Sequence, residues 1–159
     1  MDNLVLATVY ARNCSVRRIT AAEAAPFFDA NHRMGWCKCK HRYGLFVERT
    51  TGAAEAALPE GTMVAAAGFS SPRNMTRKGG SARSFEWIRY ASLDGYRVVG
   101  GMGKLMNAFA AEFHPDDIMT YVRSRESSGD AFLALGFECE GLWGKEEWGY
   151  ENLKFRKKF

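Results

Sequence analysis

The chain has 159 residues, of which 47% are hydrophobic and 25% charged, and its formal net charge is +4 at pH 7. This balance is typical of a globular protein with a real core and argues against extensive disorder. No apolar run approaches the roughly 18 residues of a membrane span, and Asp2 and Asn3 stand where a signal peptide carries basic residues. We therefore expect a single domain over residues 1–159, in the cytoplasm and without membrane contact.

The first elements are predicted to be a strand and a helix. Residues 4–10 are rich in β-formers and predict a strand. Thr20 and Glu23 have the spacing of a capping box, which predicts a helix that runs to about residue 31. Pro26 removes one internal hydrogen bond, so we expect the helix to begin later than the capping box suggests.

Two further strands are predicted next, at residues 43–48 and 62–69. The connection over residues 49–61 is rich in Ala, Gly and Thr, which indicates a long hairpin loop. Residues 70–83 are polar and basic with little periodicity, and we expect them to form a loop.

The middle of the chain predicts a strand, a crossing helix and a second strand. Residues 85–91 and 117–122 are typical of strands, and the helix between them is predicted over residues 102–113. Pro115 ends that helix. Because a helix crosses between the two strands, we expect them to pair in parallel. The helix has one apolar face, made of Met102, Leu105, Met106, Phe109, Ala110 and Phe113.

A short helix and two strands complete the predicted order. Ser127 or Ser128 is expected to cap the helix, and Gly136 to end it in the left-handed conformation. Strands are predicted at residues 137–140 and 147–153. The predicted fold is therefore α/β, with one mixed sheet of about seven strands flanked by helices.

The glycine-rich turn between the fourth strand and its helix is typical of a phosphate site, because backbone N–H groups meet there at the positive end of a helix. A P-loop requires Ser or Thr after Gly103-Lys104, but Leu105 stands there. A dinucleotide site requires Gly-x-Gly-x-x-Gly, a spacing that Gly100, Gly101 and Gly103 do not give. Coenzyme A, whose pyrophosphate needs several converging N–H groups, fits this turn best.

The pattern Arg97-x-x-Gly100-x-Met102 resembles the signature turn of the Gcn5-related N-acetyltransferases, although Met102 stands where that family has Gly or Ala. Residues 131–137, which end in Leu-Gly-Phe, resemble the closing helix and turn of the same family. The resemblance covers roughly residues 40–140. Three segments also resemble small acetyltransferase-like proteins of bacteriophages, some of which modify DNA bases: Asn31-His32-x-x-Gly35, residues 43–46 and the block from Arg89-Tyr90 to Gly100-Gly101.

The resemblance implies an acyl-CoA N-acyltransferase-like fold in which the fourth and fifth strands splay apart, and an enzyme that moves an acetyl group from acetyl-CoA to an amine. We also expect no metal, and a monomer or homodimer. The residues that it assigns to acetyl-CoA are Tyr90, Ala91, Ser92, Arg97, Val98, Val99, Gly100, Gly101, Met102, Gly103, Lys104, Ser128 and Phe132.

For catalysis, the resemblance places a carboxylate base on the fourth strand, at Glu86. His32 is the second candidate, because histidine titrates near neutral pH. The tyrosine that usually serves as the acid falls at Phe132, which cannot donate a proton, so Tyr121 is the candidate acid, with Ser124, Ser128 or water as alternatives. Each of these residues also has a purely structural interpretation, as a rim carboxylate, a helix-end histidine or a packed aromatic.

Alternative functions rest on charge and on Phe132. Basic clusters at residues 33–42, 71–83 and 154–158 leave open a nucleic-acid-binding or DNA-base-modifying protein. Phe132 leaves open a non-catalytic acyl-CoA-binding protein. Cys37 and Cys39, near His32 and His41, have a poor spacing for zinc and favour free thiols.

Overall fold

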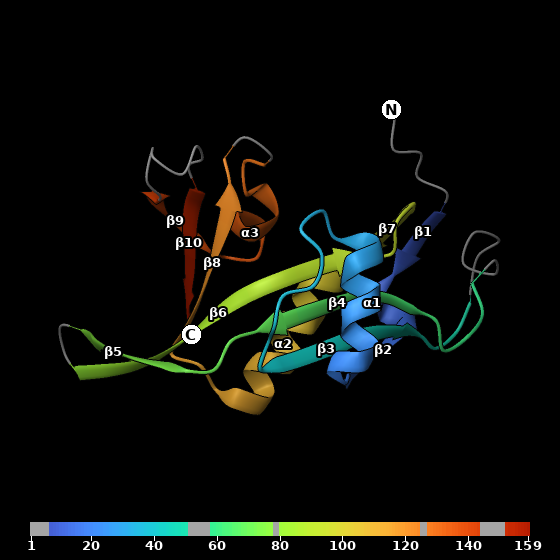
Figure 1. Cartoon of the computed structure of the whole chain (residues 1–159), viewed down its shortest axis with the longest axis horizontal. Helices are drawn as coiled ribbons and strands as arrows, with labels where there is room; N and C mark the ends of the chain where they lie inside the picture. The colour runs from blue at the N-terminus through green and yellow to red at the C-terminus, as the bar shows by residue number, and fades with distance from the viewer. Residues whose placement is uncertain (1–6, 51–57, 78–79, 125–126, 144–151) are drawn as a thin grey trace. The chain divides into compact units, whose positions relative to one another are not determined.

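The computed structural model describes residues 7–50, 58–77, 80–124, 127–143 and 152–159, and these form two compact units (Figure 1). The first unit contains Met1–Phe69 and Arg89–His114, and the second contains Ser70–Ile88 and Pro115–Phe159. Strand β6 (Gly80–Ser92) contributes its start to the second unit and its end to the first.

The first unit is built on a sheet whose neighbouring strands are β2, β3, β4 and the end of β6, with a separate parallel pair, β1 and β7. The predicted strands at residues 43–48 and 62–69 are confirmed as an antiparallel pair. Residues 4–6 of the predicted first strand lie outside the described part of the chain. β2 and β7 were not predicted. The bounds are β1 Ala7–Tyr10, β2 Cys14–Arg18, β3 His41–Val47, β4 Met63–Phe69 and β7 Tyr96–Val99, with a short 3-10 helix, η1, at Ala11–Asn13.

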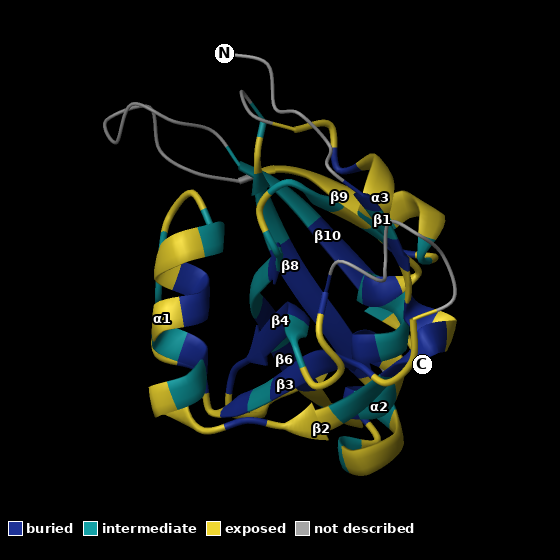
Figure 2. Ribbon diagram, turned by 90° about the vertical axis from the view of Figure 1, so that its right-hand side faces the viewer, coloured by how far each residue is buried: buried dark blue, intermediate teal, exposed yellow. Residues whose placement is uncertain are grey.

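Helix α1 (Ala21–Asn31) begins at the capping box, so the expected later start is wrong. The Thr20 hydroxyl accepts from the Glu23 N–H and the Glu23 carboxylate accepts from the Thr20 N–H, which fixes the first turn before Pro26 is reached. The helix contributes Phe27 and Phe28 to a core cluster, and its buried face is dark blue in Figure 2.

Helix α2 (Gly101–Phe113) confirms the strongest helical pattern of the sequence. Leu105, Met106 and Phe109 are buried, as the apolar face predicts. The Phe109 ring stacks on Phe69 with the ring centres 4.0 Å apart. This packing fixes α2 against the end of β4.

The second unit has the strand order β6-β8-β10-β9, with β5 paired to the start of β6. The expectation that residues 70–83 form a loop is wrong, because β5 (Arg73–Arg77) and the first residues of β6 form an antiparallel ribbon. Hydrogen bonds between the two strands stabilise the ribbon, and sequence periodicity does not reveal such pairing. The remaining bounds are β8 Asp117–Arg123, α3 Asp130–Ala134, β9 Glu138–Trp143 and β10 Asn152–Lys158.

The expected parallel pairing across the crossing helix is confirmed, and the described ladder joins residues 84–86 to 117–119. The expected caps of α3 are wrong, because Gly129, at φ +79°, is the capping residue and the Ser127 hydroxyl accepts from its N–H. Gly136 has φ +91°, which confirms the left-handed end of this helix.

Candidate functional site

The glycine-rich turn brings the positive end of α2 to the surface. Gly100 has φ +80°, a conformation that strongly favours glycine, and α2 begins at the next residue. The first N–H groups of an α-helix have no acceptor within the helix, and this first turn contains no acidic side chain. The turn therefore presents backbone donors and a favourable dipole to an anion.

The start of the helix is closely covered by Tyr90. A Cβ on the buried Gly101 would lie 2.9 Å from Val98 Cγ1 and 3.0 Å from the Tyr90 hydroxyl. Burial raises the pKa of Tyr90 to about 12, so its hydroxyl keeps its proton at neutral pH. The structure thus brings together two residues of the expected acetyl-CoA set that lie on different elements, β6 and α2.

The two cations of the turn differ in their surroundings. Lys104 Nζ binds the carbonyl oxygens of Ala11, at 2.9 Å, and Cys14, at 2.5 Å. Its charge therefore compensates one carbonyl group of η1 and one at the start of β2, and ties α2 to both. Arg97 is exposed on β7. Val98 and Val99 also lie in β7, where they pair with β1, so the turn itself is confined to Gly100 and the residues that follow.

The end of β6 carries the other expected residues of the first unit. Ala91 is buried in the same core cluster as Phe28, and Ser92 is partly buried at the last position of the strand. Met102 and Gly103, in the first turn of α2, are also partly buried.

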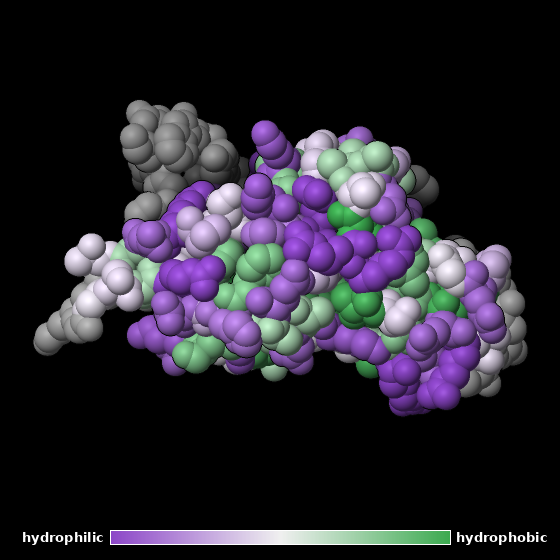
Figure 3. All heavy atoms as spheres, turned by 90° about the horizontal axis from the view of Figure 1, so that it is seen from below, coloured by the Kyte–Doolittle hydropathy of each residue, from purple (hydrophilic) through white to green (hydrophobic). Residues whose placement is uncertain are grey.

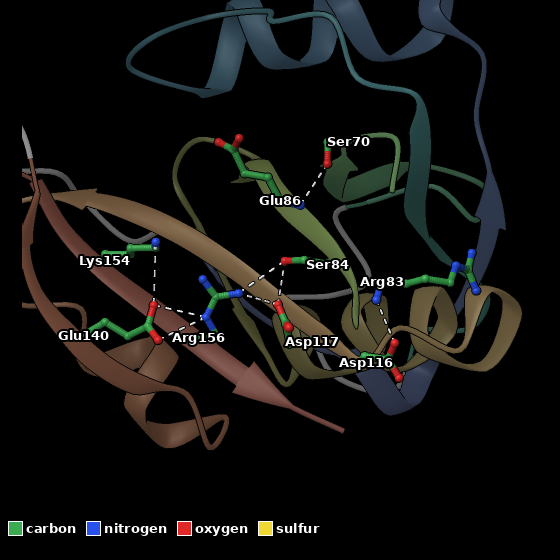
Figure 4. A network of polar contacts seen from close by, with 9 residues as sticks. All are labelled: Ser70, Arg83, Ser84, Glu86, Asp116, Asp117, Glu140, Lys154 and Arg156. Carbon is green, nitrogen blue, oxygen red and sulfur yellow. Dashed lines mark hydrogen bonds and ion pairs between the residues drawn. The ribbon is translucent and has the colours of Figure 1, made fainter. Parts of the chain in front are cut away.

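Glu86, the expected base, lies on β6 in the second unit. Its backbone N–H donates to the Ser70 hydroxyl at 2.8 Å, which fixes the strand at this point (Figure 4). Its carboxylate lies 3.5 Å from the guanidinium of Arg73, and the side chain is 22% exposed. The carboxylate is thus partly shielded and keeps contact with solvent.

Tyr121, the expected acid, lies in the same unit as Glu86. Met119 is directly opposite Glu86 in the parallel ladder, and Tyr121 follows two residues later on the same face of β8. Burial raises the pKa of Tyr121, and the negative charge of Glu86 raises it further. The structure therefore couples these two candidates electrostatically.

His32 belongs to the first unit, at the end of α1. Its backbone N–H donates to Phe28, its ring packs edge-on against the Phe28 ring, and its Nδ1 accepts from the Met34 N–H at 3.0 Å. One ring nitrogen thus has a structural role in the turn that follows the helix.

Phe132 is part of an aromatic cluster in the second unit. Its ring centre lies 5.5 Å from that of Trp87, 5.3 Å from Phe137 and 6.1 Å from Phe155. The aromatic ring at this position is therefore used for packing. Ser128 is exposed before α3, and Ser124 lies beyond the end of β8.

The second unit also contains a charged network that the sequence did not reveal (Figure 4). Arg156 on β10 binds Asp117 at 2.5 Å and the Ser84 hydroxyl at 3.2 Å, and its Nε contacts both oxygens of Glu140 at 3.1 Å. Arg156 and Asp117 have side chains only 7% and 2% exposed. The sequence places Arg156 in the basic cluster of residues 154–158, but the structure buries its side chain against Asp117.

Within the described ranges, no group of three or more His, Cys, Asp or Glu residues is placed to hold a metal ion. Cys39 is buried and donates its thiol to the Cys37 carbonyl. In the same part of the chain, no helix is long and apolar enough to cross a membrane.

No family model and no curated protein matches this chain in sequence. Solved structures do match it in fold. The NatC complex bound to Gag peptide and CoA matches with a TM-score of 0.61 at 11% identity, over 92% of this chain and 98% of the other. Arabidopsis thaliana NAA60, in complex with a bisubstrate analogue, matches with a TM-score of 0.62 at 10% identity, over 92% of this chain and 99% of the other. The ribosomal-protein-S5-alanine acetyltransferase of Vibrio fischeri matches with a TM-score of 0.59 at 17% identity, over 92% of this chain and 93% of the other.

These similarities define the class of fold. The chain has the acyl-CoA N-acyltransferase fold of the Gcn5-related N-acetyltransferases, as the resemblance at the glycine-rich turn led us to expect.

Proposed function

We propose that this protein is an acetyl-CoA-dependent N-acyltransferase that transfers an acetyl group directly to an amine. The observation that carries the proposal is the left-handed Gly100 at the start of α2, with donors and no acidic side chain in the first turn. The fold shared with acetyltransferases supports it. The acceptor is an amine whose identity is left open.

In this proposal the pyrophosphate of acetyl-CoA binds the backbone N–H groups at the start of α2. The hydroxyl of Tyr90, which stays protonated at neutral pH, is a further donor beside the same turn. Arg97, exposed on β7, supplies positive charge. Lys104 contributes through its backbone, because its side chain holds Ala11 and Cys14.

The reaction requires a base and an acid. Glu86 accepts the proton that the attacking ammonium group must lose, and the amine nitrogen then forms a bond to the thioester carbon. The carbon–sulfur bond breaks, and the leaving thiolate takes a proton from Tyr121 or from water. The Tyr121 hydroxyl is protonated before transfer, as the acid role requires, and its raised pKa makes it a weaker proton donor than an ordinary tyrosine.

Thermal unfolding with and without acetyl-CoA tests the binding step. A ligand that binds the native state stabilises it by mass action, so about a hundredfold excess over Kd adds about 2.7 kcal/mol. Gly100→Asp should abolish the shift, because it places a carboxylate at the anion site. Gly61→Asp is the matched control, since Gly61 has φ +87° and open space around it. An unshifted melting temperature in the native protein at millimolar acetyl-CoA, with an intact fold, would refute the proposal.

A further inference from the structure

The β5–β6 ribbon is a feature of the second unit for which acetyl transfer provides no role. Residues 73–77 pair with residues 80–84 in one antiparallel register, and among the described residues β5 pairs with β6 alone. The described side chains of residues 71–76 are exposed, including Met75 at 41%. The ribbon is labelled β5 at one end of β6 in Figure 1.

The register gives the ribbon two different faces. Asn74 is directly opposite Arg83, and Thr76 is opposite Ser81, so these four side chains share one face. All four residues are exposed, and each carries a hydrogen-bonding group. The other face includes Ser84, which is buried in the network around Arg156. All four side chains of the face with Asn74 and Arg83 are therefore exposed to a partner, whereas the face with Ser84 is partly buried.

Basic charge is a second feature of this ribbon, which it shares with residues 33–42 and 154–158. Hydrophilic side chains are spread over the face that Figure 3 shows, so polarity alone does not single it out. Residues 71–83 contain Arg73, Arg77, Lys78 and Arg83 and no Asp or Glu. An acid-free basic segment attracts a polyanion.

The arginine of the exposed face is held in place by the fold. The Arg83 backbone N–H donates to Asp116 at 2.7 Å, and the Asp116 N–H donates back to the Arg83 carbonyl. The guanidinium lies 5.5 Å from the centre of the Phe85 ring and extends away from the Asp116 carboxylate (Figure 4). Less side-chain freedom is then lost when this arginine binds a ligand.

We propose that this ribbon binds duplex DNA in the major groove, with Asn74, Thr76, Ser81 and Arg83 facing the base edges. The major groove of B-DNA admits a two-stranded ribbon, and Asn, Arg and hydroxyl side chains are the groups that contact base edges there. A five-residue strand spans about 17 Å, which corresponds to about five base pairs. The narrow major groove of duplex RNA does not admit such a ribbon.

Fluorescence anisotropy with a DNA duplex of about 20 base pairs tests the proposal, with duplex RNA of the same sequence and polyglutamate as the other ligands. If binding neutralises about three phosphates, affinity should fall about 40-fold between 50 and 200 mM salt. Absence of DNA binding at 50 mM salt would overturn the proposal. Equal binding of duplex RNA or of polyglutamate would also overturn it.

A matched pair of variants locates the site. Asn74→Ala combined with Arg83→Ser should lower DNA affinity at least tenfold, because it removes two groups of the exposed face. Asn107→Ala combined with Lys40→Ser removes an asparagine and one positive charge at exposed positions in the first unit and should change affinity less than twofold. An equal loss in both would show that total charge, and not the ribbon, drives binding. The acetyl-CoA melting shift should persist in both variants, which reports their folding and separates this test from that of acetyl transfer.

Discussion

The hydroxyl oxygen of Tyr90 lies 3.0 Å from the point where a Cβ on Gly101 would stand. This contact closes the start of α2 against the end of β6, within the first unit. It explains why glycine, which otherwise weakens a helix, is placed in the first turn. It also gives the turn a side-chain donor beside its backbone donors.

Gly101→Ala should therefore weaken acetyl-CoA binding and lower the free energy of unfolding by about 1–2 kcal/mol, because Tyr90 and Val98 must move to admit the methyl group. Urea unfolding and titration of acetyl-CoA measure the two effects. Tyr90→Phe combined with Gly101→Ala should recover part of the stability, since the hydroxyl is one of the two crowding groups. A double variant no more stable than Gly101→Ala would contradict this account.

Glu86→Gln should lower kcat about a hundredfold or more and leave the KM for acetyl-CoA nearly unchanged, because the amide keeps the shape of the side chain but cannot accept the proton. Steady-state kinetics with a panel of amines measures the effect. Glu138→Gln, at an exposed position of β9, is the control that removes the same charge without loss of rate. If Glu86→Gln behaves like this control, Glu86 is not the base.

The stability of the first unit should fall as the pH falls below about 6.5, the ordinary pKa of histidine. The pKa of His41 is lowered, and burial is the largest cause. The positive charge of Arg18, whose Nη2 lies 3.2 Å from His41 Nδ1, lowers the pKa further. The charges of Lys40 and Arg42 also lower it, and the negative charge of Glu112 raises it. The unfolded state then binds the proton more readily, so acidification through this range favours unfolding.

His41→Gln should reduce this pH dependence, because glutamine does not titrate. Urea unfolding at pH 8 and at pH 5.5 compares the two proteins, and the variant should lose less stability between them. Equal losses would assign the pH dependence to other groups.

Asp117→Ala should destabilise the protein by about 3–5 kcal/mol, because it removes the closest partner of the buried Arg156. Asp117→Ala combined with Arg156→Met should be more stable than Asp117→Ala alone, since no buried charge then lacks this partner. Lys154→Met, which removes a contact of 3.8 Å to Glu140, should cost less than about 1 kcal/mol. Urea unfolding measures all three, and a double variant no better than Asp117→Ala would argue against the network.

Local patterns in the sequence predicted the elements whose causes are local. The period of residues 102–113 predicted α2, and the spacing of Thr20 and Glu23 predicted the cap of α1, because both depend on neighbours within a few turns of helix. Pro26 misled the prediction of the helix start, since the cap had already fixed the first turn. The glycine-rich turn indicated both the anion site and the fold.

The sequence by itself thus determined the glycine-rich turn, the helix that follows it and the class of fold that the turn indicates. Only the tertiary structure decided that Lys104 binds the carbonyls of Ala11 and Cys14, that Tyr90 covers Gly101, and that Arg156 joins Asp117 inside the second unit. It also decided that residues 73–84 form a ribbon. The physical reason is the same in each case: these contacts join residues or strands through space, and strand pairing and burial depend on partners that no local pattern identifies.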